Sequence, residues 1–361
     1  MITSHPTTDL TVPLIQKAAI VEKPGGSVKI TERPVVQASD LKVGEVLVKI
    51  LYSGVCHTDV HIAQGAMGDP PMKHFIGGHE GSGVIVAIGE GTHTQLEVGQ
   101  AVGINWISKS CLACEACLRE GTFQQYVVSS HATHVIPIPE SLPLYSAAPI
   151  LCAGLSVYGA LKQSNTAPGD IVVITGAGGG LGHLAIQYAI NAFNLRVIAM
   201  DTGDNKKELC LKLGAEVFID FKATTEVKQV ADGVGAHAVL VTSSAPDSYE
   251  GVVEYLRPLG TLLALGVDIG CVLNLDMLTV VSRCITVKGI VNGNREVLRQ
   301  ALDIAARGRV HTICRIEPLA KLPEVFEELR AGKLAGRVVL NLVSSGRTIT
   351  FQRLICIFKW E

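Results

Sequence analysis

The chain has 361 residues, with 31 Lys and Arg against 33 Asp and Glu, and 48% of its residues are apolar. The near-balance of charge excludes the basic surface that nucleic-acid-binding proteins present. The apolar content, with only 18% charged residues, excludes a disordered chain. The length predicts two domains. No apolar run approaches the roughly 20 residues of a membrane span, so no membrane contact is expected.

The ten cysteines are interpreted through the compartment in which the chain folds. Residues 1–9 are polar and lack the apolar core of a secretory signal. We therefore expect a cytoplasmic protein, whose thiols are metal ligands, nucleophiles or small core residues rather than disulfide partners.

The N-terminal half is predicted to be mainly β-structure. Alternating stretches at Lys17–Val21 and Val46–Ile50 predict short strands, and residues 76–104 are again strand-like and rich in glycine. Gly25, Gly26 and Pro34 interrupt these strands.

After Pro149 the pattern changes to an alternation of helices and strands. Apolar strands such as Ile171–Thr175, which are typical of a buried parallel sheet, alternate with helices. This βαβ order predicts a doubly wound sheet. The expected helices are Leu151–Lys162, Leu181–Phe193, Lys206–Leu213, Asp247–Leu256, Arg295–Arg307 and Lys321–Ala331, and the expected strands are Ile171–Thr175, Arg196–Met200, Val217–Phe221, Ala238–Thr242 and Thr261–Leu265.

A glycine-rich turn, Gly176–Gly182, falls between a predicted strand and a predicted helix. Glycines there let the backbone approach a pyrophosphate, whose charge lies at the helix N-terminus. Asp201 ends the next strand, where a carboxylate binds the ribose hydroxyls of NAD and repels a 2′-phosphate. Lys206 either contacts the ribose or is a solvated helix cation. The predicted NAD(H)-binding residues are Gly176, Gly178, Gly179, Gly180, Leu181, Gly182, Asp201 and Lys206.

Three separated segments carry metal-ligand residues: Cys56–His61, Gly77–Glu80 and Pro149–Gly154. Two thiolates and one imidazole make a zinc site with an open fourth position, which suits a catalytic metal. Taken singly, Cys56 and Cys152 are more often small core residues, and His79 is more often a core histidine. Their joint presence with a dinucleotide turn favours a zinc site.

These motifs as a set resemble the zinc-dependent alcohol dehydrogenases of the medium-chain dehydrogenase/reductase superfamily, especially the fungal, tetrameric branch. The resemblance runs from about residue 17 to 343 and covers nearly the whole chain. It is carried by Ser53–Asp59, Gly78–Gly83, Gly121–Tyr126, Ile150–Gly154, Gly176–Gly182, Val217–Asp220 and Gly293–Arg295.

The resemblance implies an α/β architecture: a GroES-like, mainly-β catalytic domain and a Rossmann coenzyme domain. The expected divisions are 1–155 and 295–343 for the catalytic domain, 156–294 for the NAD-binding domain, and 344–361 for an atypical tail. It also implies a homo-oligomer, tetramer or dimer.

The resemblance further assigns roles to single residues. Cys56, His79 and Cys152 would hold the catalytic zinc, with Asp59 orienting His79 and Glu80 behind the metal. It implies that the Thr58 hydroxyl hydrogen-bonds the substrate oxygen and that His61 passes the proton to solvent. It places His57 and Arg337 near the cofactor pyrophosphate. Without the resemblance, His57 and His61 would be plain surface histidines.

The sequence departs from the family in three places. Cys111, Cys114 and Cys117 match three of the four cysteines of a structural zinc lobe, but the fourth is missing. The site is therefore incomplete, and the alternative is three free thiols on a shortened loop. Residues 344–361 add an apolar tail, which with the missing lobe suggests a gene-model or splicing artefact. Trp106 matches one of two family tryptophans over the substrate, whereas Met67 replaces the other and predicts room for alcohols bulkier than ethanol.

We therefore expect a zinc-dependent oxidoreductase that uses NAD(H) to interconvert an alcohol and its aldehyde or ketone. The expected substrate is a primary alcohol, and a secondary alcohol is the alternative. One alternative is a reductase of a specialised or secondary-metabolite carbonyl compound. Another is a catalytically impaired homologue that binds nucleotide or a partner subunit, which the truncated lobe favours. A zinc-free quinone-reductase-like protein is disfavoured, because the three zinc ligands would have no use in it.

Overall fold

The computed structural model describes residues 9–66, 75–105, 121–222, 231–332 and 334–343. Met67, Trp106, Cys111, Cys114, Cys117 and the tail 344–361 lie outside the described residues, as do the expectations placed on them. The chain forms two compact units. One comprises Met1–Cys152 with Ile313–Glu361, and the other comprises Ala153–Thr312.

The first unit is built on a seven-stranded sheet around β3 (Val46–Val55), as predicted for the N-terminal half. β3 pairs antiparallel with three neighbours, and its Val- and Ile-rich sequence is buried along most of its length. A three-stranded sheet in the order β2-β1-β4 completes this unit. The other strands are β1 (Ile15–Val21), β2 (Val28–Pro34), β4 (Phe75–Ile76), β5 (Gly81–Ile88), β6 (Ala101–Ile104), β7 (Tyr126–Ser129), β8 (Val135–Pro137), β15 (Cys314–Pro318) and β16 (Arg337–Asn341).

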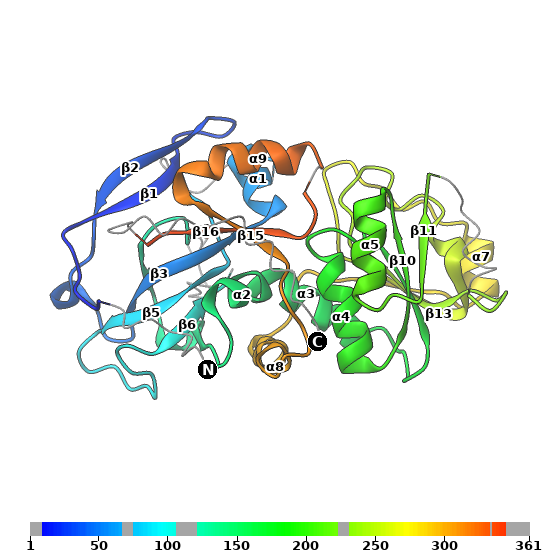
Figure 1. Ribbon diagram of the computed structural model, residues 1–361, viewed down its shortest axis with the longest axis horizontal. Helices are drawn as coiled ribbons and strands as arrows, with labels where there is room; N and C mark the ends of the chain where they lie inside the picture. Colours follow the sequence, from blue (N-terminus) through cyan, green and yellow to red (C-terminus); the bar gives the residue numbers. More distant parts are fainter. Residues whose placement is uncertain (1–8, 67–74, 106–120, 223–230, 333, 344–361) are drawn as a thin grey trace. The chain divides into compact units, whose positions relative to one another are not determined.

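Three helices of the first unit bear on the site. α1 (His57–Ala63) follows β3 directly and lies side by side with α9 (Leu322–Arg330) (Figure 1). α2 (Leu144–Pro149) packs on β3 and β5. The last segment of the chain thus returns to the first half, because β16 pairs with β3.

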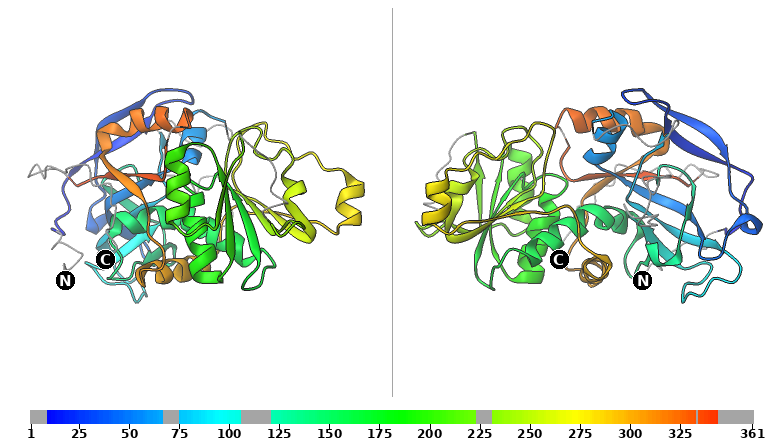
Figure 2. Two further views of the ribbon diagram at one scale, coloured as in Figure 1. Left: turned by 45° about the vertical axis from the view of Figure 1, so that its right-hand side comes forward. Right: turned by 180° about the vertical axis from the view of Figure 1, so that it is seen from behind.

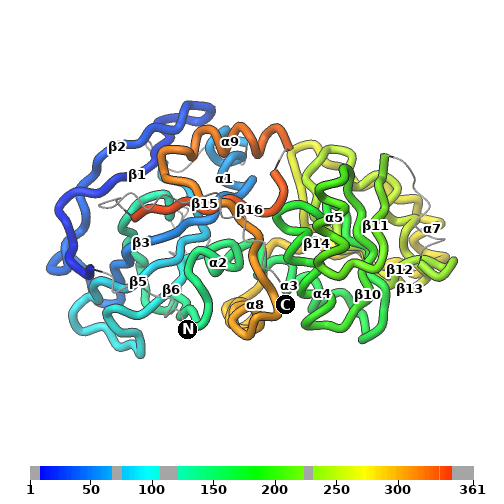
Figure 3. Tube along the Cα trace, in the orientation of Figure 1, coloured from blue at the N-terminus to red at the C-terminus, as the bar shows by residue number. Residues whose placement is uncertain are grey.

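The second unit is a six-stranded parallel sheet in the order β11-β10-β9-β12-β13-β14, which can be followed along the trace in Figure 3. This is the strand order of a dinucleotide-binding Rossmann domain. Helix α4 (Gly182–Phe193) packs on β9 and β10 (Figure 2). The strands are β9 (Ile171–Thr175), β10 (Arg196–Asp201), β11 (Val217–Asp220), β12 (Ala236–Val241), β13 (Leu256–Ala264) and β14 (Thr286–Gly289), and the other helices are α3 (Leu155–Lys162), α5 (Asp204–Lys212), α7 (Met277–Ser282) and α8 (Arg295–Ala306).

The structure differs from the sequence-based expectation in the segment 247–256. The expected helix is wrong: the chain forms turns followed by one short 3₁₀ helix, η5 (Val252–Tyr255), and β13 begins at Leu256. Gly251 adopts a left-handed backbone conformation with φ of 64°, which cannot continue an α-helix. The helix predicted from the apolar spacing of this segment therefore cannot continue through Gly251.

The return to the first unit also differs from the expected boundary at residue 295, because the second unit runs to Thr312. Hydrogen bonds join helix α8 to this unit. The hydroxyl of Tyr188, in α4, donates to the carbonyl of Ala301 over 2.9 Å, and the hydroxyl of Tyr158 lies 3.2 Å from Gln300 Oε1. Because these hydrogen bonds join α8 to α3 and α4, α8 belongs to the second unit and not to the catalytic segment that the sequence suggested.

The helical stretch Leu144–Lys162 joins α2, a π-turn at Ile150–Gly154 and α3. By length and composition it could cross a membrane, with a mean hydropathy of 1.5. However, 83% of the 18-residue stretch that has this hydropathy is buried inside the protein. Such burial is typical of a core helix, whose apolar surface is covered by the fold itself.

Candidate active site and metal centre

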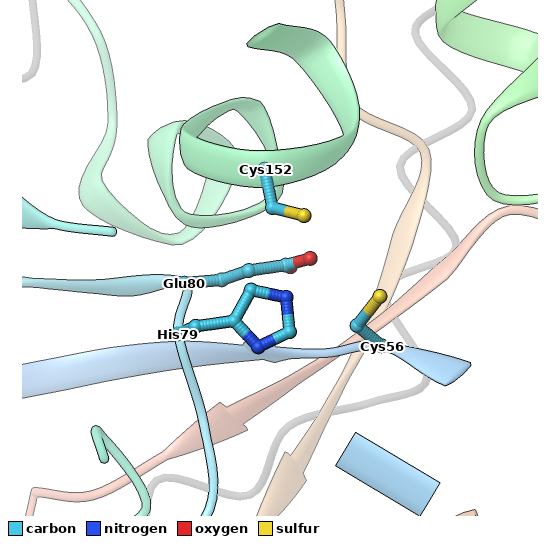
Figure 4. Close-up of side chains that lie close together, drawn as sticks. All are labelled: Cys56, His79, Glu80 and Cys152. Atoms are coloured by element: carbon cyan, nitrogen blue, oxygen red, sulfur yellow. The ribbon is translucent and has the colours of Figure 1, made fainter. Parts of the chain in front are cut away.

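Cys56, His79, Glu80 and Cys152 converge in the first unit (Figure 4). Each offers one ligand atom, and these atoms all lie within 4.8 Å of one another. Cys56 follows β3, the pair His79–Glu80 directly precedes β5, and Cys152 belongs to the π-turn. The structure therefore brings together the predicted zinc ligands from three separate segments.

The start of α1 fixes the position of Cys56. Cys56 is the N-cap residue, and Asp59 occupies the third helical position of a capping box. Asp59 Oδ2 accepts a hydrogen bond from the Cys56 amide over 3.0 Å, and Oδ1 accepts one from the Gly78 amide over 2.9 Å. One buried carboxylate thus ties the Cys56 segment to the segment that carries His79.

The same carboxylate orients His79. Its Oδ1 lies 3.0 Å from His79 Nδ1. Because an ionised carboxylate can only accept, Nδ1 carries the proton and Nε2 is left as the coordinating nitrogen. Burial lowers the pKa of His79, but the Asp59 charge and hydrogen bond outweigh it and hold the pKa well above its ordinary value. The predicted role of Asp59 as the carboxylate behind His79 agrees with this geometry.

The two thiols shift each other's pKa in opposite directions. A hydrogen bond from Cys152 holds the pKa of the Cys56 thiol well below its ordinary value, and the same bond together with burial raises the pKa of the Cys152 thiol. Binding of a divalent cation would favour the second thiolate and release its proton. Two sulfur atoms and one imidazole nitrogen are the donor set that zinc prefers, so these residues fit that metal.

Glu80 offers the fourth ligand atom of the cluster and is fully buried. Its Oε1 forms an ion pair with Nη2 of Arg337, while Oε2 has no hydrogen-bond partner among the described residues. Burial raises the pKa of Glu80 to about 7. An orphaned carboxylate oxygen next to two thiols is a further donor that suits a cation.

Gly54 makes room for this carboxylate. A Cβ atom at position 54 would lie 1.9 Å from Glu80 Oε2, so any other side chain would displace Glu80. Sequence reasoning missed this residue. The available signal was its place in the Ser53–Cys56 turn, next to a metal-ligand candidate.

Helix α1, whose N-cap is Cys56, carries Thr58 and His61, which are predicted to transfer the proton, and His57, which is predicted to lie near the pyrophosphate. The Cys56 thiol lies 3.6 Å from Thr58 Oγ1, and the rings of His57 and His61 are 5.5 Å apart between centroids. Thr58, His57 and His61 are each partly exposed. The Thr58 hydroxyl therefore lies next to one cluster sulfur, and the roles of Thr58, His57 and His61 stay predictions.

The predicted dinucleotide turn folds tightly around Asp201 in the second unit. Gly176 has a φ of 69°, and the Gly178 amide donates to Asp201 Oδ2 over 2.9 Å. Lys206 Nζ lies 2.9 Å from the other carboxylate oxygen of Asp201. A Cβ atom at Gly182 would lie 2.3 Å from the Gly176 carbonyl oxygen, so glycine is required for this close helix–strand approach.

Two hydrogen bonds that stabilise this turn were not found from the sequence. The Thr242 hydroxyl, just after β12, donates to the Thr175 carbonyl over 2.6 Å, and His183 Nδ1 lies 2.9 Å from the Gly179 carbonyl. Thr242 is distant from the glycine motif in the sequence, and His183 lies next to the motif but has no feature that marks it as functional. Only the folded sheet places Thr242 beside the end of β9.

Arg337 occupies a different environment from the one suggested by its predicted cofactor role. It is 8% exposed and its guanidinium contacts Glu80 in the first unit. Its contact with a pyrophosphate stays a prediction. The geometry shows that Arg337 forms an ion pair with Glu80, a member of the candidate ligand cluster.

Comparisons with known proteins agree with this geometry. Residues 42–140 match the family model of the alcohol dehydrogenase GroES-like domain, and residues 180–307 match that of the zinc-binding dehydrogenases. An alcohol dehydrogenase from Schizosaccharomyces pombe is 42% identical over 92% of this chain and 99% of its own.

Two solved structures extend the comparison. The alcohol dehydrogenase of the archaeon Aeropyrum pernix has a TM-score of 0.80 at 27% identity, covering 90% of this chain and 99% of its own. The acetophenone reductase of Geotrichum candidum, solved in complex with NAD, has a TM-score of 0.77 at 25% identity, covering 92% and 98%. The match therefore includes both units of the chain.

The Asp59 geometry generates a prediction. Asp59→Asn keeps the size of the side chain but removes the charge, and one of its polar atoms becomes a donor facing the amides of Cys56 and Gly78. We expect zinc affinity to fall by about 10- to 100-fold, as for other carboxylates behind a metal-bound histidine. Competition with a chromogenic chelator measures this. Asp40→Asn, on the exposed surface, is the matched control, and equal affinities for both variants would contradict the prediction.

Proposed function

We propose a specific activity for this chain, which belongs to the zinc-dependent alcohol dehydrogenase family of the medium-chain dehydrogenase/reductase superfamily. It interconverts an alcohol bulkier than ethanol and its aldehyde or ketone with NAD(H), using a zinc ion held by Cys56, His79 and Cys152. The observation that carries this proposal is the convergence of two thiols and an oriented imidazole within 4.8 Å.

Residues of this chain divide the chemistry between them. A zinc ion held at the cluster would polarise the alcohol or carbonyl oxygen, and NAD(H) would accept or supply the hydride. Thr58 Oγ1 takes the alcohol proton and passes it toward His61, from which it reaches solvent. Asp59 keeps His79 in the tautomer that offers Nε2. Glu80 serves as an alternate oxygen donor behind the zinc, and Arg337 balances its charge.

NAD(H) is proposed to bind at the Gly176–Gly182 turn. The N–H groups of the first turn of α4 have no partner within the helix and attract a pyrophosphate. Asp201 accepts hydrogen bonds from the ribose and repels a 2′-phosphate, with Lys206 beside it. His57 and Arg337 are proposed to lie near the pyrophosphate.

The size of the substrate rests on Met67, a flexible side chain where the family has tryptophan. The acetophenone reductase to which this chain is similar is named for an aromatic ketone. A preference for carbonyl reduction of a specialised compound is the second candidate within the same chemistry. The intact cluster speaks against a catalytically impaired homologue, and the metal status of Cys111, Cys114 and Cys117 stays a prediction, as does a cytoplasmic location.

The proposal predicts zinc in the purified protein and NAD-dependent alcohol oxidation. Elemental analysis of protein prepared without a metal-affinity tag should find tightly bound zinc that Cys152→Ser loses. Steady-state assays should give a higher kcat/KM for benzyl alcohol than for ethanol, and the ratio of kcat/KM in the two directions separates the dehydrogenase from the reductase. A folded, NADH-binding protein without zinc would overturn the proposed site, and a strong preference for ethanol would overturn the substrate class.

Coenzyme choice gives a second prediction. Asp201→Asn retains an oxygen that accepts from the Gly178 amide but removes the charge that repels a 2′-phosphate. We expect the ratio of kcat/KM for NADP to that for NAD to rise by about tenfold or more, because a like-charge repulsion is lost. Asp204→Asn, an exposed carboxylate in the first turn of α5, should leave the ratio unchanged. An unchanged ratio in Asp201→Asn would remove Asp201 from the ribose site.

A homo-oligomer, dimer or tetramer, is proposed from the exposed apolar side chains of the second unit. They lie between residues 259 and 291, around α7 and the edge strand β14. Monomeric proteins rarely leave such a surface open, and an edge strand invites pairing. The side chains are Leu259, Val267, Ile269, Val272, Met277, Leu278, Val281, Val287 and Val291.

The oligomer prediction uses charge at this surface. Val281→Asp would bury a carboxylate on association, so we expect the sedimentation coefficient to fall to that of a smaller species, at least in part. Val43→Asp changes a residue of similar exposure, 71% against 68%, in the first unit and is the control. A wild-type protein that sediments as a monomer would contradict the proposal.

A further inference from the structure

Cys152 lies at the centre of the π-turn Ile150–Gly154, within a stretch that is otherwise α-helical. Pro149 ends α2 immediately before it. Because Pro149 has no N–H, it cannot donate to the carbonyl of Tyr145 four residues earlier, which favours a local departure from α-helical geometry. A π-turn accommodates one additional residue, and this turns the side chains that follow by about 100° around the helix axis.

The two residues before Cys152 pack this turn against the sheet. The side chains of Ile150 and Leu151 are fully buried. Leu151 lies over Gly103 of β6: a Cβ atom there would be 2.5 Å from Leu151 Cδ2 and 3.0 Å from Cδ1. At the other end of α2, the Ser82 hydroxyl donates to the Leu144 carbonyl over 2.8 Å. The helix is therefore held against the sheet at both ends.

We propose that Gly103 is a positioning residue for Cys152: its missing side chain forms the seat into which Leu151 fits, and this contact sets where the Cys152 sulfur meets Cys56 and His79. The inference deepens the proposed function and rests on it only for the identity of the metal. It assigns a role to a glycine that touches none of the reacting atoms.

The magnitudes support a positional effect. Carbon atoms in contact prefer a separation of about 3.5–4.0 Å, so a Cβ atom at position 103 requires a shift of about 1 Å. Leu151 is fully buried, and protein interiors are close-packed, so we infer that part of this shift reaches the backbone of the π-turn. A metal site tolerates errors of only about 0.2 Å in its ligand distances. The required shift is several times larger than this tolerance, so even a part of it would move the Cys152 sulfur out of place.

The experiment compares Gly103→Ala with Gly103→Ala/Leu151→Val, in which one carbon atom is gained and one is lost. Val135→Ala is the matched control. Val135 is fully buried in β8, but it points to the opposite face of the sheet from Ile136, the residue nearest Gly103 on that strand. The single variant should bind zinc at least about tenfold more weakly, whereas the double variant and Val135→Ala should stay within about threefold of the wild type.

Two further readouts separate position from activity. With Co²⁺ in place of zinc, the thiolate-to-metal absorption should weaken in Gly103→Ala and recover in the double variant. In metal-free protein, a trivalent phenylarsenical should bridge Cys56 and Cys152, as mapped by peptide mass spectrometry, and Gly103→Ala should slow the bridging. This last measurement needs no metal.

The outcomes distinguish the two proposals. If the wild type holds no zinc at the cluster, the proposed function fails, and the arsenical bridging alone decides the role of Gly103. If Gly103→Ala matches the wild type in both zinc affinity and bridging, or if Val135→Ala shows the same loss, the inference is overturned. If Gly103→Ala does not fold, the double variant decides: recovery of folding and of the bridging rate supports the seat, and failure of either overturns it.

Discussion

The Asp59 carboxylate is the constraint on which the site depends. It accepts hydrogen bonds from the Cys56 amide and the Gly78 amide and faces His79 Nδ1, all within 3.0 Å. Asp59 is almost fully buried, so none of these bonds competes strongly with water. The same group therefore starts helix α1, fixes the loop before β5 and selects the histidine tautomer. Loss of this one carboxylate would disturb two of the three proposed zinc ligands together.

Charge balance is the second constraint. The first unit gathers two thiols and the buried carboxylates of Glu80 and Asp59 around Arg337 and around His79, whose pKa is held well above its ordinary value. Burial of several anionic groups is costly unless cations compensate them. In the metal-free protein the pKa of the Cys152 thiol is raised, and the pKa of Glu80 is raised to about 7. A divalent cation would remove the need for both adjustments, which explains why zinc fits this cluster chemically.

Missing side chains shape both units. Gly54 leaves the space that the Glu80 carboxylate occupies, Gly103 leaves the seat of Leu151, and Gly182 lets α4 approach the end of β9. In each case a Cβ atom would approach within 2.5 Å of a neighbouring atom. The functional groups are thus positioned as much by close approach of the backbone as by hydrogen bonds.

The sequence by itself determined the class of fold, the parallel sheet with its glycine turn and the candidate zinc ligands, because periodicity and clustered ligand residues are local in the chain. It could not establish that Gly251 ends the apolar spacing of 247–256, nor that α8 is bonded to α4 through Tyr188. Only the tertiary structure decided the pairing of Glu80 with Arg337, the space at Gly54 and the contact of Leu151 with Gly103. These features depend on contacts between residues far apart in the chain, whose spacing in sequence carries no record of their distance in space.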